Sequence, residues 1–334
     1  MKMDVSLLRP FVPMDPIETH PVTQLVAEDL FSRLWLGQSW TLDPTAICAH
    51  LAGADIRVPI GIGVSVTTAR HPIQGALEAR TVTAVTGHVP HVAFGPGSLA
   101  LQNALLGSAL RRPVTETSRF LAEVRNELGS PTRSGESPSP PVRLPPSVAP
   151  MPRLGMGVLR TAMAEAAGRC ADSAVLWMTP TAYIEHTIIP ALDRGSGRAG
   201  VSRPSVVAMI PTVPDSARVN PINATDSTVG GHIKLAHYRD MLCRASLVMS
   251  GDRHADAITL MSGGAVLHGD QAEFAAGMRR FERAGVDDLV INLTGVHHLA
   301  GPSAVGSAVD EVLAAAQLAG VGPHGSWSKE RKDR

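Results

Sequence analysis

Short runs of apolar residues alternate with longer stretches of helical periodicity along most of the chain. Runs short enough for buried strands, and rich in Val, Ile, Leu and Met, lie at 3–8, 33–37, 57–66, 90–94, about 150–156, 173–178, 204–211 and 287–293. Stretches with helical spacing lie at 19–31, 43–53, 72–86, 98–109, 114–128, 158–170, 180–192, 234–248, 270–284 and 303–318. This α/β alternation predicts a (β/α)8 TIM barrel, and a doubly wound open parallel sheet is the alternative.

One segment interrupts the alternation. Residues 129–150, GSPTRSGESPSPPVRLPPSVAP, are rich in Pro and Ser and contain almost no large apolar side chain, a composition that cannot bury a core. Because the segment falls between the fourth and fifth strands, we interpret it as a flexible insertion in a single domain, 1–320. A linker between two domains is the alternative. Residues 321–334 form a polar C-terminal tail.

Composition narrows the class of partner. The chain of 334 residues has 30 basic and 30 acidic side chains and only 4% aromatic residues, so there is no basic stripe or stacking platform for nucleic acid. No window approaches 18 apolar residues, and the N-terminal MKMDVSLLRPFVPMDP contains no apolar run of signal-peptide length. The three cysteines are scattered, as in reduced proteins. We therefore expect a cytoplasmic protein without nucleic-acid or membrane partners.

Candidate chemistry follows the predicted strands, because the active sites of such barrels lie at the carboxyl ends of the strands. These ends carry Gly37-Gln38-Ser39-Trp40, then Ser65, Thr67, Thr68, Arg70 and His71, then Gly95-Pro96-Gly97-Ser98, Gly155 to Arg160, Met178-Thr179, and Thr294, His297 and His298. Glycine turns that open into helices suit phosphate, since free backbone N–H groups point at the anion. The turn GMGVLR opens directly onto helix 158–170. The alternative is that these glycines only close tight connections.

Several familiar kinds of site are excluded. The chain lacks H-E-x-x-H, G-x-x-x-x-G-K-[ST], G-x-S-x-G and a G-x-G-x-x-G carried on a strand. It also lacks the paired carboxylates of a glycosidase at the strand ends. His88 and His91 flank the start of a strand, and adjacent His297 and His298 would face opposite ways on a strand, so we predict no metal site. A site of backbone, hydroxyls and apolar walls suits a cofactor that carries its own reactivity.

Four segments carry a family resemblance. They are LWLGQSWTLDP (34–44), VPIGIGVSVTTARHPIQGALEARTVTAVTGHVPHVAFGPGS (58–98), GVLRTAMAEAAGRCADSAVLWMTPTAYIEHTIIPAL (157–192) and FERAGVDDLVINLTG (281–295). The order of strand, Arg-His-Pro, helix, glycine-containing turn and FGPGS resembles the bacterial luciferase-like superfamily. Its members are FMN-dependent monooxygenases or oxidoreductases that use the deazaflavin coenzyme F420. The resemblance covers most of residues 5–310 and implies the barrel fold.

The resemblance also implies a cofactor site at the C-terminal mouth of the barrel. Gly155, Met156, Gly157 and Val158 would bind phosphate through backbone N–H groups, with Arg160 assisting. The flavin-like ring would lie over strand 57–66, in contact with Gly63, Val64, Ser65 and Thr67, and Gly95, Gly97 and Ser98 would line its other side. A non-prolyl cis peptide is implied at Gly63–Val64, with Val64–Ser65 as second choice.

The sequence departs from the deazaflavin-dependent sugar-phosphate dehydrogenases of this superfamily. Their Asp-His pair after the second strand corresponds to Gln38-Ser39, and their acidic residue after the fourth strand to Ser98 or a neighbour. Their phosphate-binding lysine corresponds to the stretch Thr179-Pro180-Thr181, of which Thr179 is assigned to the cofactor site. We therefore expect a different activity and a substrate that need not be anionic.

The proton donor stays open among Arg9, Gln38, Ser39, Trp40, Thr67, His297 and His298. Of these we assign Gln38, Ser39 and His297 to catalysis and Arg9, Trp40 and His298 to the substrate site. Arg70 and His71 either touch the ligand or only begin the next helix and brace the rim.

An Ala-, Gly-, Pro- and Arg-rich chain suggests a GC-rich genome, in which the deazaflavin is common, so coenzyme F420 is the expected cofactor and FMN the alternative. The expected reaction is reduction of a C=C or C=N bond of a small or peptide-borne substrate in natural-product tailoring, for instance a dehydroamino acid. The alternatives are an FMN-dependent monooxygenase and a non-catalytic barrel that binds a partner. Members of the superfamily are often homodimers, and we expect the same here.

Overall fold

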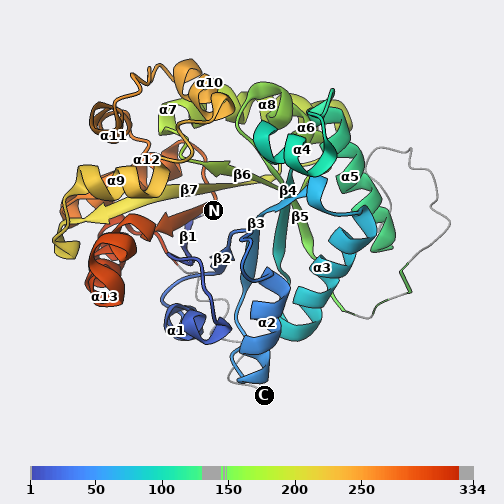
Figure 1. Cartoon of the computed structure of the whole chain (residues 1–334), viewed down its shortest axis with the longest axis horizontal. Helices are drawn as coiled ribbons and strands as arrows, with labels where there is room; N and C mark the ends of the chain where they lie inside the picture. Colours follow the sequence, from blue (N-terminus) through green and yellow to red (C-terminus); the bar gives the residue numbers. More distant parts are fainter. Residues whose placement is uncertain (1, 130–143, 146, 148, 323–334) are drawn as a thin grey trace.

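Parallel strands close into a barrel in the computed structural model, which describes residues 2–129, 144–145, 147 and 149–322 (Figure 1). The barrel strands are β1 (Asp4–Leu8), β2 (Leu34–Leu36), β3 (Ile60–Val66), β4 (His91–Gly95), β5 (Arg153–Gly157), β6 (Ser173–Trp177), β7 (Ser205–Pro214) and β9 (Asp288–Asn292). Every neighbouring pair is parallel, and pairing of β6 with β7 closes the ring. The structure confirms the predicted (β/α)8 barrel and excludes the open sheet.

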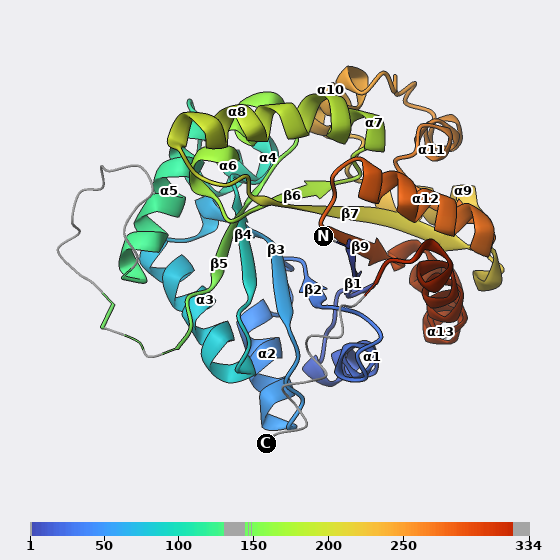
Figure 2. The ribbon, with the colours of Figure 1, turned by 180° about the vertical axis from the view of Figure 1, so that it is seen from behind.

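Helices surround the barrel on its outside (Figures 1 and 2). The longer ones are α1 (His20–Ala27), α2 (Pro44–Gly53), α3 (Pro72–Thr86), α4 (Leu99–Leu106), α5 (Pro113–Glu127), α6 (Thr161–Cys170), α8 (Ile189–Ala199), α9 (Pro221–Val229), α10 (Ala236–Arg244), α11 (Arg253–Ser262), α12 (Gln271–Arg283) and α13 (Thr294–Ala319). Short turns of helix are η1 (Pro16–Thr19), η2 (Thr67–Ala69), α7 (Thr181–Tyr183), η3 (Ile184–Ile188) and η4 (Asp215–Ala217). None of the described helices is long and apolar enough to cross a membrane.

Most predicted elements are present, with three differences in the second half. Helices α9 and α11 and the short strand β8 (Leu267–Gly269), which pairs with the end of β7, were not predicted. The predicted helix 158–170 begins only at Thr161, because β5 continues to Gly157. The predicted helix 303–318 begins at Thr294, with a kink at Gly301, whose φ of 76° only glycine adopts freely.

The predicted insertion 129–150 joins α5 to β5, between the fourth and fifth strands. Most of it, and the tail from residue 323 onward, lies outside the described residues. Among the described residues of the insertion, the backbone N–H of Leu144 donates to Glu127 at 3.0 Å, and the carbonyl of Pro145 accepts from Arg80 at 2.8 Å.

The barrel interior is filled by side chains rather than open. A buried cluster fills it, made of Trp35, Ala93, Val175, Val207, Met209 and Val290. Near the start of β9, the indole Nε1 of Trp35 donates to Asp288 at 3.2 Å. Since the interior is packed, we expect the ligand beyond the carboxyl ends of the strands, where the active sites of such barrels lie.

Candidate active site

Apolar side chains form the floor of the barrel mouth. Leu8, Val64 and Trp177 pack on the interior cluster and remain partly exposed. Each lies at or near the carboxyl end of its strand, so the three side chains face the space above the interior cluster.

The carboxyl end of β3 leaves the regular ladder. The peptide bond between Gly63 and Val64 is cis, at the position that the family resemblance implied. The pairing of β3 with β4 shifts register between Gly63 and Ser65. The Val64 side chain lies over the next two strands, because a Cβ added at Gly95 or at Gly157 would be 3.1 Å from one of its methyl groups. We call Val64, Gly95 and Gly157 the glycine shelf.

The glycine shelf brings together residues predicted from distant segments. It lies across β3, β4 and β5, and at Gly95 and Gly157 no side chain rises from β4 or β5. A surface of backbone and one branched side chain suits the face of a flat ring, because nothing protrudes from it.

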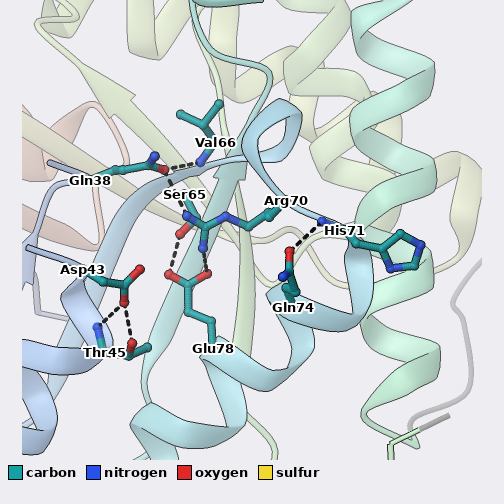
Figure 3. Close-up of polar contacts among 9 residues, drawn as sticks. All are labelled: Gln38, Asp43, Thr45, Ser65, Val66, Arg70, His71, Gln74 and Glu78. Atoms are coloured by element: carbon teal, nitrogen blue, oxygen red, sulfur yellow. Dashed lines mark hydrogen bonds and ion pairs between the residues drawn. The ribbon is translucent and has the colours of Figure 1, made fainter. Parts of the chain in front are cut away.

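A polar network lies beside this shelf, between β3, α3 and the loop after β2 (Figure 3). The hydroxyl of Ser65 donates to Glu78 Oε1 at 2.6 Å, and Arg70 forms an ion pair with Glu78 Oε2. Arg70 Nη2 also donates to Gln38 Oε1 at 3.3 Å, and the backbone N–H of Val66 donates to the same oxygen at 2.7 Å. We call Gln38, Ser65, Arg70 and Glu78 the shelf network.

Sequence reasoning missed Glu78, although a signal was present. The residue lies on the buried side of α3 beside Gly75, Ala79 and Val82, so a carboxylate stands among small apolar side chains. Burial raises the pKa of the Glu78 carboxyl, and the Arg70 guanidinium and the Ser65 hydroxyl oppose that rise. A carboxylate on the buried face of a helix needs partners, and here they are Ser65 and Arg70.

The structure gives Arg70 and His71 the structural role that the sequence left open. His71 is the N-cap of α3, where its ring accepts from the backbone N–H of Ile73 at 3.3 Å. Gln74 returns the contact by accepting from the His71 backbone N–H at 3.2 Å (Figure 3). His71 thus begins the helix, and Arg70 braces the rim through Glu78.

Hydroxyl groups predicted for the site also hold loops. Ser98 caps α4 by accepting from the backbone N–H of Leu101 at 3.2 Å, and Gly97 before it has a φ of 75°. The Ser39 hydroxyl donates to the carbonyl of Leu42 at 2.8 Å and accepts from its N–H at 3.3 Å. Thr67 is half-buried in η2, directly after the bulge.

The predicted phosphate turn is displaced along the chain. Gly155, Met156 and Gly157 are residues of β5, and the N–H of Val158 donates to the carbonyl of Val175 at 2.9 Å. These amides therefore belong to the sheet, and the prediction that they form a free turn is wrong. The uncommitted backbone N–H groups at this end are those of the first turn of α6, which follows its N-cap residue Arg160.

Arg160 carries a partner that the sequence did not indicate. Its Nη1 lies 2.9 Å from Asp240 Oδ2 on α10, and Asp240 also accepts from Arg244 at 3.0 Å. The pair with Asp240 is partly exposed, with side-chain exposures of 47% and 38%. Arg160 can therefore exchange Asp240 for another anion at little cost.

Arg9 and His297 meet at Phe11, beside the first and last strands of the barrel. Arg9 is buried and its Nε donates to the carbonyl of Phe11 at 3.0 Å, while the His297 ring stacks on Phe11 at 4.9 Å. Burial lowers the pKa of Arg9 to about 10, so the side chain is still charged at pH 7. Burial, and then the adjacent His298, lower the pKa of His297.

His297 and His298 lie on a helix rather than in a loop or strand, because α13 starts at Thr294. The two rings still point differently. His297 Nδ1 is buried without a partner among the described residues, whereas exposed His298 contacts the Ser227 hydroxyl at 3.1 Å. His298 therefore contacts α9.

The part of the mouth over β6 and the segment after β7 is aromatic. Trp177 at the end of β6 lies 5.3 Å from the ring of His232, which contacts Tyr238 at 5.4 Å. Trp177 Nε1 and His232 Nδ1 are buried and have no partner among the described residues. We call Trp177, His232 and Tyr238 the aromatic side. Neither His232 nor Tyr238 was predicted for the site, although Tyr238 lies in the predicted helix 234–248.

Two further predicted residues take different places. Thr179 is 2% exposed and donates to the carbonyl of Trp177 at 3.1 Å. Trp40 is 68% exposed, in the loop that follows β2. Within the part of the chain that the structure describes, no group of three or more His, Cys, Asp or Glu side chains could hold a metal ion.

Residues 22–288 match the model of one protein family, described as luciferase-like monooxygenase. The chain belongs to the luciferase-like monooxygenase family. The sequence matches none of the curated proteins. Monooxygenases and oxidoreductases share the fold of this family, so the chain is expected to be an enzyme of this kind.

Solved structures share the family fold at low sequence identity. An F420-dependent secondary alcohol dehydrogenase in complex with an F420–acetone adduct has a TM-score of 0.71 at 14% identity, over 93% of this chain and 99% of that chain. Riboflavin lyase with modified FMN and riboflavin has a TM-score of 0.71 at 12% identity, over 96% and 93%. EDTA monooxygenase from Chelativorans sp. BNC1 has a TM-score of 0.68 at 14% identity, over 97% and 95%.

These solved structures are similar to the chain over nearly their whole length, and at 12–14% identity the likeness shows the shared fold. Their identities are too low to transfer a cofactor or a substrate. That assignment depends on the residues at the mouth.

Proposed function

We propose that the protein is an oxidoreductase that binds coenzyme F420 at the barrel mouth and transfers a hydride between it and an organic substrate. The observation that supports this most is the glycine shelf. Val64, Gly95 and Gly157 leave an apolar surface without protruding side chains, and a Cβ added at either glycine would lie 3.1 Å from a methyl group of Val64, a contact tighter than most. Such a surface fits the face of a deazaflavin or flavin ring.

The first turn of α6 supports the same placement. Its N–H groups and Arg160 follow directly after β5, the strand that carries Gly157. A phosphate bound there would be held while the ring rests on the shelf. Arg160 would leave Asp240 for the phosphate, and the positive end of the helix would add to the attraction. When bound, the deazaflavin supplies the hydride chemistry.

The chain's own residues would bind, orient and exclude water. Leu8, Val64 and Trp177 provide the apolar floor, and Gln38 lies beside the shelf with a fixed amide oxygen. These groups favour a substrate with little charge, and we propose a C=C or C=N bond of a natural product, for instance a dehydroamino acid. His297, with its free Nδ1 and lowered pKa, is the proposed proton-transfer residue.

An FMN-dependent monooxygenase is the second candidate. It is favoured by the family description and by the likeness to EDTA monooxygenase and to riboflavin lyase, whose structure holds modified FMN. The glycine shelf accepts either ring, because it recognises a flat face rather than particular atoms. A homodimer remains part of the proposal.

Fluorescence titration of the purified protein with F420 and with FMN tests the proposal. We expect micromolar binding of F420 and much weaker binding of FMN. Binding of FMN without binding of F420 would favour the monooxygenase. Binding of neither would leave the barrel without its proposed cofactor and overturn both candidates.

A further inference from the structure

The buried carboxylate of Glu78 connects two segments that meet at the shelf. One oxygen accepts from the Ser65 hydroxyl, directly after the bulge of β3, and the other pairs with Arg70 (Figure 3). The Glu78 and Arg70 side chains are only 4% and 13% exposed. The ion pair is thus part of the interior and is not a surface contact.

Arg70 passes this contact on to Gln38. Its Nη2 and the backbone N–H of Val66 both donate to Gln38 Oε1, at 3.3 and 2.7 Å. Two donors on one oxygen fix which end of the amide faces the network. The Gln38 nitrogen therefore points away from it. That nitrogen has no partner among the described residues and is absent from their buried, unpartnered atoms, so it is open to a ligand.

We propose that Glu78 is a positioning residue of the cofactor site. Through Arg70 it orients the Gln38 amide, and through Ser65 and the Gln38–Val66 contact it holds the bulged end of β3 in the form that receives the ring. The inference rests on the proposed function in one respect, that the ring lies on Val64. Preorganised sites of this kind depend on supporting hydrogen bonds behind the residues that touch the ligand.

A purely structural role explains this ion pair poorly. A buried ion pair is often no more stabilising than two well-packed apolar side chains of similar volume. The surrounding face of α3 is small and apolar, so an apolar pair would fit the fold. What an apolar pair cannot do is donate to Gln38 or accept from Ser65. These two hydrogen bonds are the contribution specific to Glu78 and Arg70.

The test is the double substitution Glu78→Leu with Arg70→Met. It removes both charges together and leaves neither buried alone, so we expect a melting temperature within about 4 °C of the wild type. We expect F420 affinity, or FMN affinity if FMN is the ligand, to fall by about tenfold or more. Wild-type affinity in the folded double variant would overturn the proposal.

A matched control exists at the other end of the barrel. Arg125 and Asp172 form a pair of similar burial, 9% and 14% exposed, at a distance of 3.0 Å. The double substitution Arg125→Met with Asp172→Leu is expected to lower the melting temperature, because Asp172 also accepts from the Leu154 backbone N–H at 2.9 Å, and to leave cofactor affinity unchanged. Equal losses of affinity in both double variants would show that stability alone governs binding, which contradicts the proposal.

A measurement on the cofactor-free protein separates this inference from the proposed function. The Val66 amide hydrogen is protected by Gln38 Oε1, so its exchange with solvent reports whether Gln38 is held. We expect exchange at Val66 to become about tenfold faster in Glu78→Leu with Arg70→Met, and in Gln38→Met. Unchanged exchange in the double variant would overturn the positioning role whichever cofactor binds, whereas a wild type that binds neither cofactor would overturn only the proposed function.

Discussion

The two sides of the barrel mouth are built in opposite ways. Over β3, β4 and β5 the glycine shelf presents backbone and one valine, and the shelf network beside it is held by hydrogen bonds and an ion pair. Over β6 and the segment after β7, the aromatic side presents large rings, with the nitrogens of Trp177 and His232 buried and unpartnered. One side is flat and backed by hydrogen-bonded side chains, and the other is crowded and has unpartnered ring nitrogens.

This difference indicates that the two sides bind different ligands. A surface without protruding groups recognises a flat ring by shape, while unpartnered buried nitrogens are costly unless something hydrogen-bonds to them. We infer that the shelf receives the cofactor and that the aromatic side receives the substrate. Substitutions that change one side at a time test this inference.

The largest effect is expected from Gly157→Val. Its Cβ would lie 3.1 Å from Val64, and its methyl groups would crowd the space above the shelf. We expect cofactor affinity to fall by at least about 100-fold, together with a loss of about 1–3 kcal/mol in the free energy of unfolding from overpacking. Fluorescence titration and urea unfolding measure the two effects.

Gly306→Ala is the matched control, because a Cβ at this exposed position of α13 meets nothing within 4 Å. It should leave affinity unchanged. Wild-type affinity in Gly157→Val would show that the ring does not rest on the shelf.

The next largest effect is a difference in stability between substitutions of two tryptophans that both face the barrel interior. Trp35 at the base donates to Asp288, whereas Trp177 at the mouth has no partner. We expect Trp35→Phe to cost about 1–3 kcal/mol beyond the loss of packing, because the buried Asp288 loses a donor. Trp177→Phe loses no hydrogen bond and should cost about 1 kcal/mol or less, from packing alone.

Cofactor affinity should be unchanged in Trp177→Phe, while kcat/KM for the substrate falls about tenfold if the indole N–H binds it. Urea unfolding measures the change in stability of each variant, and cofactor titration measures the affinity. A loss of cofactor affinity in Trp177→Phe would place the ring on the aromatic side instead and reverse the comparison.

The same contrast decides what sequence alone could predict. The barrel strands follow from short apolar runs in the sequence. The cis bond before Val64 and the place of Gly95 and Gly157 in the site follow from the family resemblance. Gly95, Gly157 and Val64 were all predicted for the site. That Val64 lies against both glycines became apparent only from the fold. The predicted phosphate-binding role of Val158 was wrong. Strand β5 extends one residue further than predicted, so the Val158 N–H bonds to the sheet instead of lying in a free turn.

Helix α9, which precedes His232 of the aromatic side, escaped prediction for a physical reason. Helix α9, PINATDSTV, is short and polar, so it has little periodicity to detect. It is fixed by a contact between distant residues, since Arg253 Nε on α11 donates to Asp226 at 2.8 Å. Glu78 was missed likewise, because its partners Ser65 and Arg70 come together only when α3 packs on β3.

A smaller effect is expected from acid on the aromatic side. Burial, and then His237, lower the pKa of His232 below its usual value of 6.5, so the folded protein binds this proton less readily than the unfolded chain does. Below pH 6.5 the unfolded chain binds the proton more readily, so stability falls as the pH drops, by up to about 1.4 kcal/mol per pH unit for this group. His232→Phe should remove that part of the slope between pH 6.5 and 5 in urea unfolding. His254→Phe, at an exposed position of α11, is the control and should leave the slope unchanged, and an unchanged slope in His232→Phe would show that His232 is not the group responsible.

The smallest effect concerns the boundary between the two sides, where Arg160 pairs with Asp240. If the phosphate of the cofactor replaces Asp240, then Asp240→Asn should raise affinity for FMN or F420 by about two- to fivefold, since an exposed ion pair contributes about 0–1 kcal/mol. Affinity for riboflavin, or for the deazaflavin nucleus without its phosphate, should stay the same. Isothermal titration with each matched pair of ligands measures the difference. An equal gain for the ligands without phosphate would show that Asp240 acts on the ring instead, and the phosphate would then have to lie elsewhere than at the first turn of α6.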